Sequence, residues 1–124
     1  MQATYVRLFS DEMGESHFQD LEVSLEPQDF SPPAAPLHIA PFLETARSLW
    51  VGAPPDWGGE TPHASPQRQL FCLLEGTYEV TASDGEIRRF TPGSVLLLED
   101  TSGKGHSTRI VGDTDALLFA VALA

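Results

Sequence analysis

The chain has 124 residues, of which 41% are hydrophobic and 20% charged, and its formal net charge is −11. This size and composition predict a single globular domain over residues 1–124, and no apolar run approaches the ~20 residues that a membrane-spanning helix needs. Because such an acidic chain repels phosphate backbones and anionic lipid surfaces, we expect no nucleic-acid and no membrane partner. The N-terminus lacks the basic start and apolar stretch of a secretory signal, which makes the cytoplasm the expected compartment.

The first half of the chain contains short strand patterns separated by prolines and glycines. Residues 4–9 and 18–25 are typical of strands, the second because its apolar side chains alternate. Residues 31–41 hold four prolines and predict an extended arm on the surface or at a subunit contact. Residues 43–51 favour a strand over a short helix, and residues 52–62 form a loop rich in glycine and proline.

The second half of the chain has clearer strand signals. Residues 68–81 predict a long strand that is interrupted at Gly76. Asp84-Gly85 predicts a two-residue hairpin turn, because both positions tolerate positive φ, and residues 86–90 form the returning strand. Further strands are expected after the Pro92-Gly93 turn, at 94–98, 106–111 and 116–122. Many short strands with regular turns, and almost no helix signal, predict an all-β sandwich or barrel.

Two histidines are the first candidates for a functional site. Alternate residues of a strand point to the same face, so Gln69, Phe71 and Leu73 share one face. An extended continuation would bring His63 onto that face, and His106 begins a later strand. If both faces line the interior, two imidazoles and an amide meet in a small apolar cavity. Such a group suits either a metal site or an acid–base pair.

The segment from residue 63 to residue 76 resembles the first sequence motif of the cupins. That motif has the order His-x-His, three or four residues, Glu, six residues, Gly. The same spacing here carries His63, Ser65, Gln69 and Gly76. The match is in spacing and in the first histidine, and it is a hypothesis that depends on its structural context.

A later stretch, from Gly93 to His106, resembles the second cupin motif, with Gly103-x-x-His106 in the place of its Gly-x-x-His. The resemblance covers roughly residues 60–122. It implies an all-β, single-domain cupin, which is a jelly-roll-like, double-stranded β-helix barrel. Residues 1–55 would then supply the N-terminal strands and the proline-rich arm, and residues 60–122 the barrel core.

The same resemblance implies a metal site with altered ligands. Metal-binding cupins use three histidines and one glutamate; His63 and His106 match two of them, whereas Ser65 and Gln69 stand where a histidine and the glutamate would be. The implied cofactor is a divalent metal (Fe, Mn, Ni or Zn) held by His63, Gln69 and His106. Because a hydroxyl is a poor ligand and an amide is neutral, the affinity falls below that of the usual site. A metal-free site with a histidine general base is the alternative.

The expected function is the binding of a small organic molecule inside the barrel. If the chain is an enzyme, cupins of this size imply a dioxygenase, isomerase, decarboxylase or lyase with His63 and His106 as catalytic residues; the alternative is a non-catalytic binding or sensing module. The residues expected to line the substrate site are Phe71, Leu73, Thr108, Trp57 and Asp100, the last also as an extra ligand or site carboxylate. Open strand edges and the proline-rich arm predict a homodimer.

Overall fold

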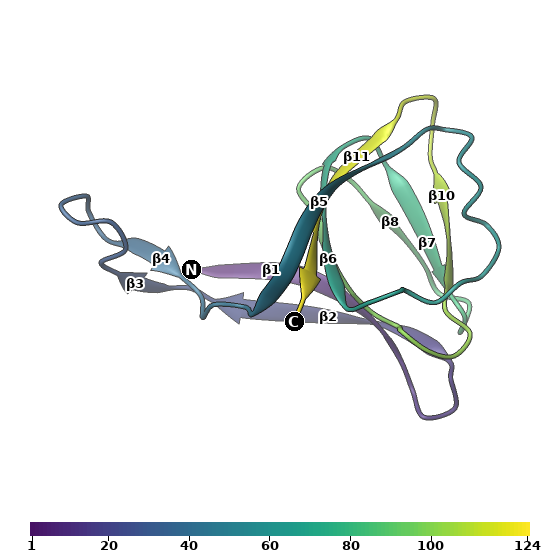
Figure 1. The fold of residues 1–124 in the computed structure, drawn as a ribbon, viewed down its shortest axis with the longest axis horizontal. Coiled ribbons are helices and arrows are strands. Elements are labelled where there is room, and N and C mark those ends of the chain that lie inside the picture. Colours follow the sequence, from purple (N-terminus) through teal and green to yellow (C-terminus); the bar gives the residue numbers. More distant parts are fainter.

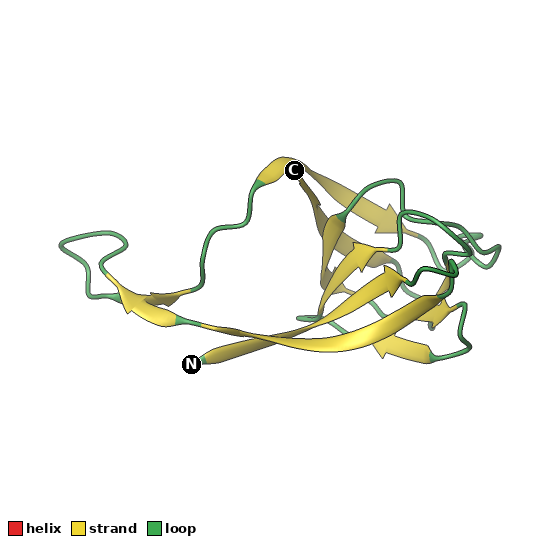
Figure 2. Cartoon of the chain, turned by 90° about the horizontal axis from the view of Figure 1, so that it is seen from below, coloured by secondary structure: helices red, strands yellow, loops and turns green.

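The computed structural model describes residues 1–124 and contains strands and loops but no helix (Figure 1, Figure 2). The all-β prediction is therefore confirmed, and no helix is present that could cross a membrane. In chain order the strands are β1 (Gln2–Ser10), β2 (Ser16–Ser24), β3 (Glu26–Gln28), β4 (Leu37–Ile39), β5 (Thr45–Ala53), β6 (Gln69–Glu75), β7 (Tyr78–Ala82), β8 (Ile87–Phe90), β9 (Val95–Glu99), β10 (His106–Ile110) and β11 (Ala116–Leu123).

Two sheets enclose the interior of the molecule (Figure 1). The large sheet has the strand order β2-β1-β9-β6-β11-β5, and the small sheet has the order β10-β7-β8. Only β1 and β9 pair in parallel; every other pair of neighbouring strands is antiparallel. The core between the sheets includes Leu8, Leu73, Val80 and Leu96, each at most 1% exposed.

The closed barrel expected from the sequence does not form. Along the free edge of β10, the small sheet gains one isolated bridge, between His63 and His106, but no further strand. The segment that lies beside β10 contains Pro54, Pro55 and Pro62, whose missing N–H groups cannot continue a ladder of hydrogen bonds. The two sheets therefore keep free edges, and the interior opens where the ladder is missing.

Gly76 redirects the chain from one sheet to the other. The long strand expected over residues 68–81 is two strands, β6 in the large sheet and β7 in the small sheet. Gly76 has φ +80°, and a Cβ at this position would lie 2.4 Å from the main-chain oxygen of Asp115. Only glycine accepts both the positive φ and this close approach without strain. Because β7 belongs to the small sheet, Tyr78 lies across the interior from β6 side chains such as Phe71.

The proline-rich arm expected over residues 31–41 belongs to a hairpin that projects from the body of the protein (Figure 2). In this hairpin β3, which precedes the arm, pairs with β4, and Phe30 and Leu37 are more than half exposed. The expected strand at 43–51 is β5, which forms one edge of the large sheet. Its residue Trp50 is 67% exposed and contacts Phe119 edge-on.

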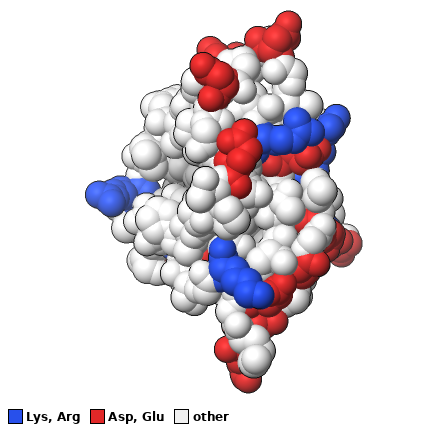
Figure 3. Space-filling model, turned by 90° about the vertical axis from the view of Figure 1, so that its right-hand side faces the viewer, with Lys and Arg blue, Asp and Glu red and all other residues white.

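Six of the seven basic residues form ion pairs with acidic side chains, and Arg47 on β5 is the exception. On the face drawn in Figure 3, basic groups lie directly against acidic ones in two places. Glu79, for example, accepts hydrogen bonds from Arg109 and Arg89, which lower the pKa of its carboxyl group. The positive charge of the surface is therefore largely neutralised locally.

Candidate functional site

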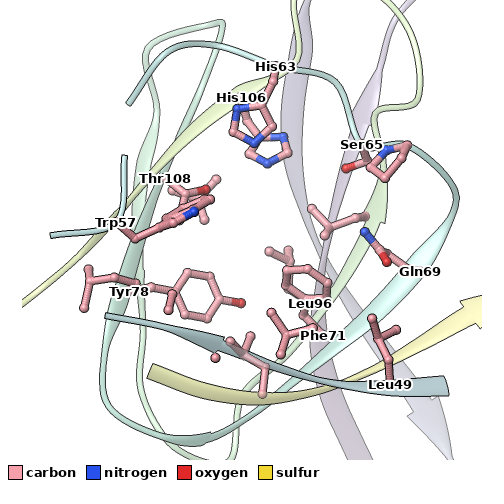
Figure 4. A pocket seen from close by; sticks show the side chains of 18 of the residues that line it. Leu49, Trp57, His63, Ser65, Gln69, Phe71, Tyr78, Leu96, His106 and Thr108 are labelled. Atoms are coloured by element: carbon pink, nitrogen blue, oxygen red, sulfur yellow. The ribbon is translucent and has the colours of Figure 1, made fainter. Parts of the chain in front are cut away.

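A cavity of about 380 Å³ lies between the two sheets (Figure 4). It is more than twice the size of the ~150 Å³ cavity that holds benzene, and it is within the usual range of small-molecule pockets. None of its lining residues is Asp, Glu, Lys or Arg. The lining consists of Leu49, Val51, Gly52, Ala53, Trp57, His63, Ser65, Pro66, Gln67, Gln69, Phe71, Tyr78, Val80, Leu96, Leu98, His106, Thr108, Ile110 and Leu118.

His106 is bound on its far side by a buried carboxylate. Its Nδ1 lies 2.5 Å from Oδ2 of Asp100, which follows β9 and is 0% exposed. The hydroxyl of Ser65 donates to the other oxygen, Oδ1 of Asp100, at 2.7 Å. Because a carboxylate oxygen accepts hydrogen bonds, we assign the imidazole proton to Nδ1. Nε2 of His106 is then an acceptor, and no group of the chain hydrogen-bonds to it.

His63 is adjacent and is oriented in the same way. Its Nδ1 donates to the main-chain oxygen of Thr61 at 2.8 Å, which leaves Nε2 as an acceptor. The main chains of His63 and His106 exchange two hydrogen bonds of 2.9 Å, and the two ring centroids are 4.8 Å apart. The pair sits at one end of the cavity (Figure 4). In the neutral imidazoles, two acceptor nitrogens therefore lie together at one end of an uncharged and mainly apolar cavity.

The chain before β10 is built for this close approach. Gly105 has φ +69°, and a Cβ there would lie 2.2 Å from the main-chain oxygen of His63. A side chain at this position would push the two histidine segments apart. The buried hydroxyl of Ser16 donates to the main-chain oxygen of Gly105 at 2.6 Å and fixes the same turn from the other side. The position of His106 thus depends on two distant parts of the sequence.

Tyr78 contributes a polar group that sequence reasoning missed. The residue is 3% exposed, and its hydroxyl has no hydrogen-bond partner in the chain. Its ring stacks on Phe90 at a centroid distance of 5.1 Å, and Figure 4 shows the hydroxyl directed into the cavity. Because Gly76 interrupts the strand, the alternation of side chains before it does not show on which face of the sheet Tyr78 lies. Counting back from Val80, two residues along the same strand, would have placed both side chains on one face.

Most of the residues expected at the site do line the cavity, namely His63, Gln69, Phe71, Trp57, His106 and Thr108. Leu73 does not, because it lies two residues beyond Phe71 along β6 and is packed in the hydrophobic core. Asp100 does not line the cavity either, because it lies behind His106 with both oxygens occupied. Asp100 is instead the hydrogen-bond partner of His106, which lines the cavity.

The donors in the cavity do not fit a tightly held divalent metal. No group of three His, Cys, Asp or Glu side chains is arranged so that it could hold a metal ion. The two imidazoles lie together, but Gln69 is set apart from them in Figure 4 and offers only a neutral amide. The nearest carboxylate, Asp100, already accepts from Ser65 and His106. Two neutral nitrogens without an anionic ligand hold a divalent cation weakly.

Comparison with known proteins adds no further likeness: no family model matches the chain, and no curated protein has a matching sequence. The similarity to cupins therefore rests on motif spacing around His63 and His106. The structure itself shows an all-β fold in which both histidines line one cavity between the two sheets.

Proposed function

We propose that the chain is a cupin-like enzyme that binds a small, neutral organic molecule between its two sheets and transfers a proton with His106 as the general base. The cupin part of the proposal is supported by the motif spacing and by the two facing sheets. The enzymatic part is supported by one observation above all. The buried Asp100–His106 pair presents an unpartnered imidazole nitrogen to an uncharged cavity.

This pair has the arrangement that a general base needs. With its proton held at Nδ1, His106 offers the lone pair of Nε2 to a substrate proton. Once Nε2 is protonated, the carboxylate of Asp100, 2.5 Å away, stabilises the imidazolium that results. Ser65 holds the carboxylate in place through its second oxygen. Few groups nearby compete for the proton, because the surrounding wall is mainly apolar.

His63 provides a second nitrogen at the same end of the cavity. Its Nε2 is an acceptor for the reason given above, and its ring centroid is 4.8 Å from that of His106. Two neighbouring bases suit reactions in which a proton leaves one position of the substrate and returns at another. Among the enzyme classes expected for a cupin of this size, this favours an isomerase or a lyase over a dioxygenase, whose chemistry needs a metal that the donors do not fit.

The lining of the cavity indicates the class of substrate. No cationic side chain is present to pair with a carboxylate or a phosphate, and no anionic one to pair with an amine. An unpaired charge buried in such a space is strongly disfavoured. The volume of about 380 Å³ leaves room for one or two fused rings. A neutral, ring-sized molecule with an acidic hydrogen fits both the lining and the base.

Deuterium exchange into an enolisable ketone tests the proposal, because exchange next to the carbonyl needs a base and no cofactor. Acetophenone and 1-tetralone are incubated with the protein in D₂O and followed by NMR. We expect exchange above background with the wild type and a loss of about 10²- to 10⁴-fold with His106→Ala. His38→Ala, at an exposed position far along the arm, is the matched control and should retain the rate.

The same experiment separates the enzyme from a binding module. Ketone binding without exchange would contradict the catalytic part and leave a cavity that only holds its ligand. Exchange that survives His106→Ala would contradict the assignment of the base.

We also propose that two copies of the chain associate along β5. This strand is a nine-residue free edge without proline, and its one charged residue is Arg47. Trp50 and Leu49 on the same strand are 67% and 44% exposed. An open edge of this length with exposed apolar side chains is a template for pairing with another strand, and a symmetric pair of identical edges is the simplest closed solution.

A further inference from the structure

We propose that the hydroxyl of Tyr78 is the specificity-determining hydrogen-bond donor of the cavity, and that it selects neutral ligands carrying an acceptor oxygen such as a ketone carbonyl. The inference rests on the proposed function, since it assumes that the cavity holds a ligand. It goes further by naming the residue that recognises the ligand and the group that is recognised. Its starting point is a buried polar atom for which the chain provides no partner.

An unpartnered hydroxyl in this position is unfavourable for the free protein. Buried polar groups in folded proteins are almost always hydrogen-bonded, because a buried group without a partner has lost its water and gained nothing in return. Tyr78 is 3% exposed, and Figure 4 shows its oxygen pointing from the small sheet into the cavity. The partner that this hydroxyl lacks is therefore one that enters the cavity.

The hydroxyl acts as a donor under ordinary conditions. Burial raises the pKa of Tyr78 well above its usual value, so the phenol keeps its proton across the working range. At the other polar end, Nε2 of His63 and Nε2 of His106 are acceptors. A ligand that satisfies both ends has its acceptor oxygen at Tyr78 and its acidic hydrogen toward the histidines. A carbonyl compound that also has an acidic hydrogen carries both groups.

The donor is also held rigidly. Tyr78 lies in β7, the central strand of the small sheet, where it pairs with Ile110 of β10 and Phe90 of β8. Its ring stacks on Phe90 with an interplanar angle of 19°. A donor fixed in advance discriminates more strongly between ligands than a mobile one, because little freedom is lost on binding. A hydrocarbon of the same shape would leave the hydroxyl unpaired.

Matched pairs of ketone and hydrocarbon test the inference. Acetophenone with ethylbenzene and 1-tetralone with tetralin are titrated against the wild type, Tyr78→Phe and Tyr5→Phe, and binding is followed by ligand-observed NMR. Tyr5 lies on β1 outside the cavity lining and controls for the loss of a phenol hydroxyl elsewhere. We expect Tyr78→Phe to weaken ketone binding about tenfold and to leave hydrocarbon binding unchanged. Tyr5→Phe should change neither.

The stability of the free protein gives an independent measurement. Because the hydroxyl of Tyr78 has no partner, Tyr78→Phe should melt at the same temperature as the wild type or higher. A lower melting temperature together with unchanged ketone binding would show a purely structural role and overturn the inference. Equal losses for ketone and hydrocarbon would also overturn it.

The two proposals fail in different ways. Ketone binding that depends on Tyr78 but is not followed by deuterium exchange removes the general base and leaves the recognition role of Tyr78 intact. Exchange that proceeds with unchanged ketone affinity in Tyr78→Phe removes only the recognition role. If neither ketone nor hydrocarbon binds the wild type, the cavity is not a ligand site and both proposals are wrong.

Discussion

Asp100→Asn is the sharpest test of the proposed base. The amide keeps the shape of the carboxylate, and its oxygen can still accept the hydrogen bond from Ser65. Its NH₂ group then faces Nδ1 of His106 as a donor, where the carboxylate oxygen was an acceptor at 2.5 Å. The imidazole proton must move to Nε2. The nitrogen that faces the cavity changes from an acceptor to a donor, and the general base is lost.

The size of the effect follows from the burial of the pair. The side chains of Asp100 and His106 are 0% and 7% exposed, so water does not restore the lost tautomer. We expect the exchange rate to fall about 10²- to 10⁴-fold, as when a positioned base is removed. Replacing a charge-assisted hydrogen bond by a neutral one should cost about 1 kcal/mol of folding free energy. For a chain of this length that corresponds to a fall of about 4 °C in Tm.

The assay is deuterium exchange into 1-tetralone at equal ketone occupancy, alongside a thermal melt. Asp113→Asn, at an exposed loop position, is the matched control and should retain both the rate and the Tm. Asp100→Ala is a poorer variant, because it leaves the Ser65 hydroxyl and His106 Nδ1 buried without a partner. A wild-type rate in folded Asp100→Asn would refute the role of Asp100, and a lost rate with lost ketone binding would point to a collapsed cavity.

Three further predictions concern metal, assembly and pH. Untagged protein should contain less than one divalent metal per chain by elemental analysis, and added Zn²⁺ should bind weakly and be lost in His63→Ala; stoichiometric metal would contradict this. Sedimentation should show a dimer that Trp50→Lys dissociates, whereas a 13.5 kDa wild-type species would rule the dimer out. Hydrogen bonds to Asp11 and then Asp84 raise the pKa of His17 above 6.5, so its contribution to stability is present below that pH and lost as the pH rises through the raised value. The difference in Tm between wild type and His17→Gln should therefore shrink from about pH 5 to about pH 9, and a constant difference would contradict the linkage.

Local features of the sequence identified most of the strands. Apolar alternation and turn residues such as Asp84-Gly85 depend on near neighbours in the chain, and the expected strands at 86–90, 94–98 and 106–111 lie within a residue or so of β8, β9 and β10. The spacing from residue 63 to residue 106 also singled out both cavity histidines. These signals can be recognised without the tertiary structure, because they depend only on backbone geometry and on the periodicity of side chains along the sequence.

Contacts between distant residues decided the chemistry of the site. The sequence could not show that Asp100 binds Nδ1 of His106, because the loop between them must turn back before the two meet. The sequence also could not show that the chain passes from the large sheet to the small sheet at Gly76. This change of sheet is the reason that Tyr78 lines the cavity. From the sequence we could predict an all-β chain and single out two histidines, His63 and His106, which both line one cavity. The fold was needed to show that the partner of His106 is a buried carboxylate and that the cavity is lined by no charged Asp, Glu, Lys or Arg side chain, because cavity walls come from segments that are far apart in sequence.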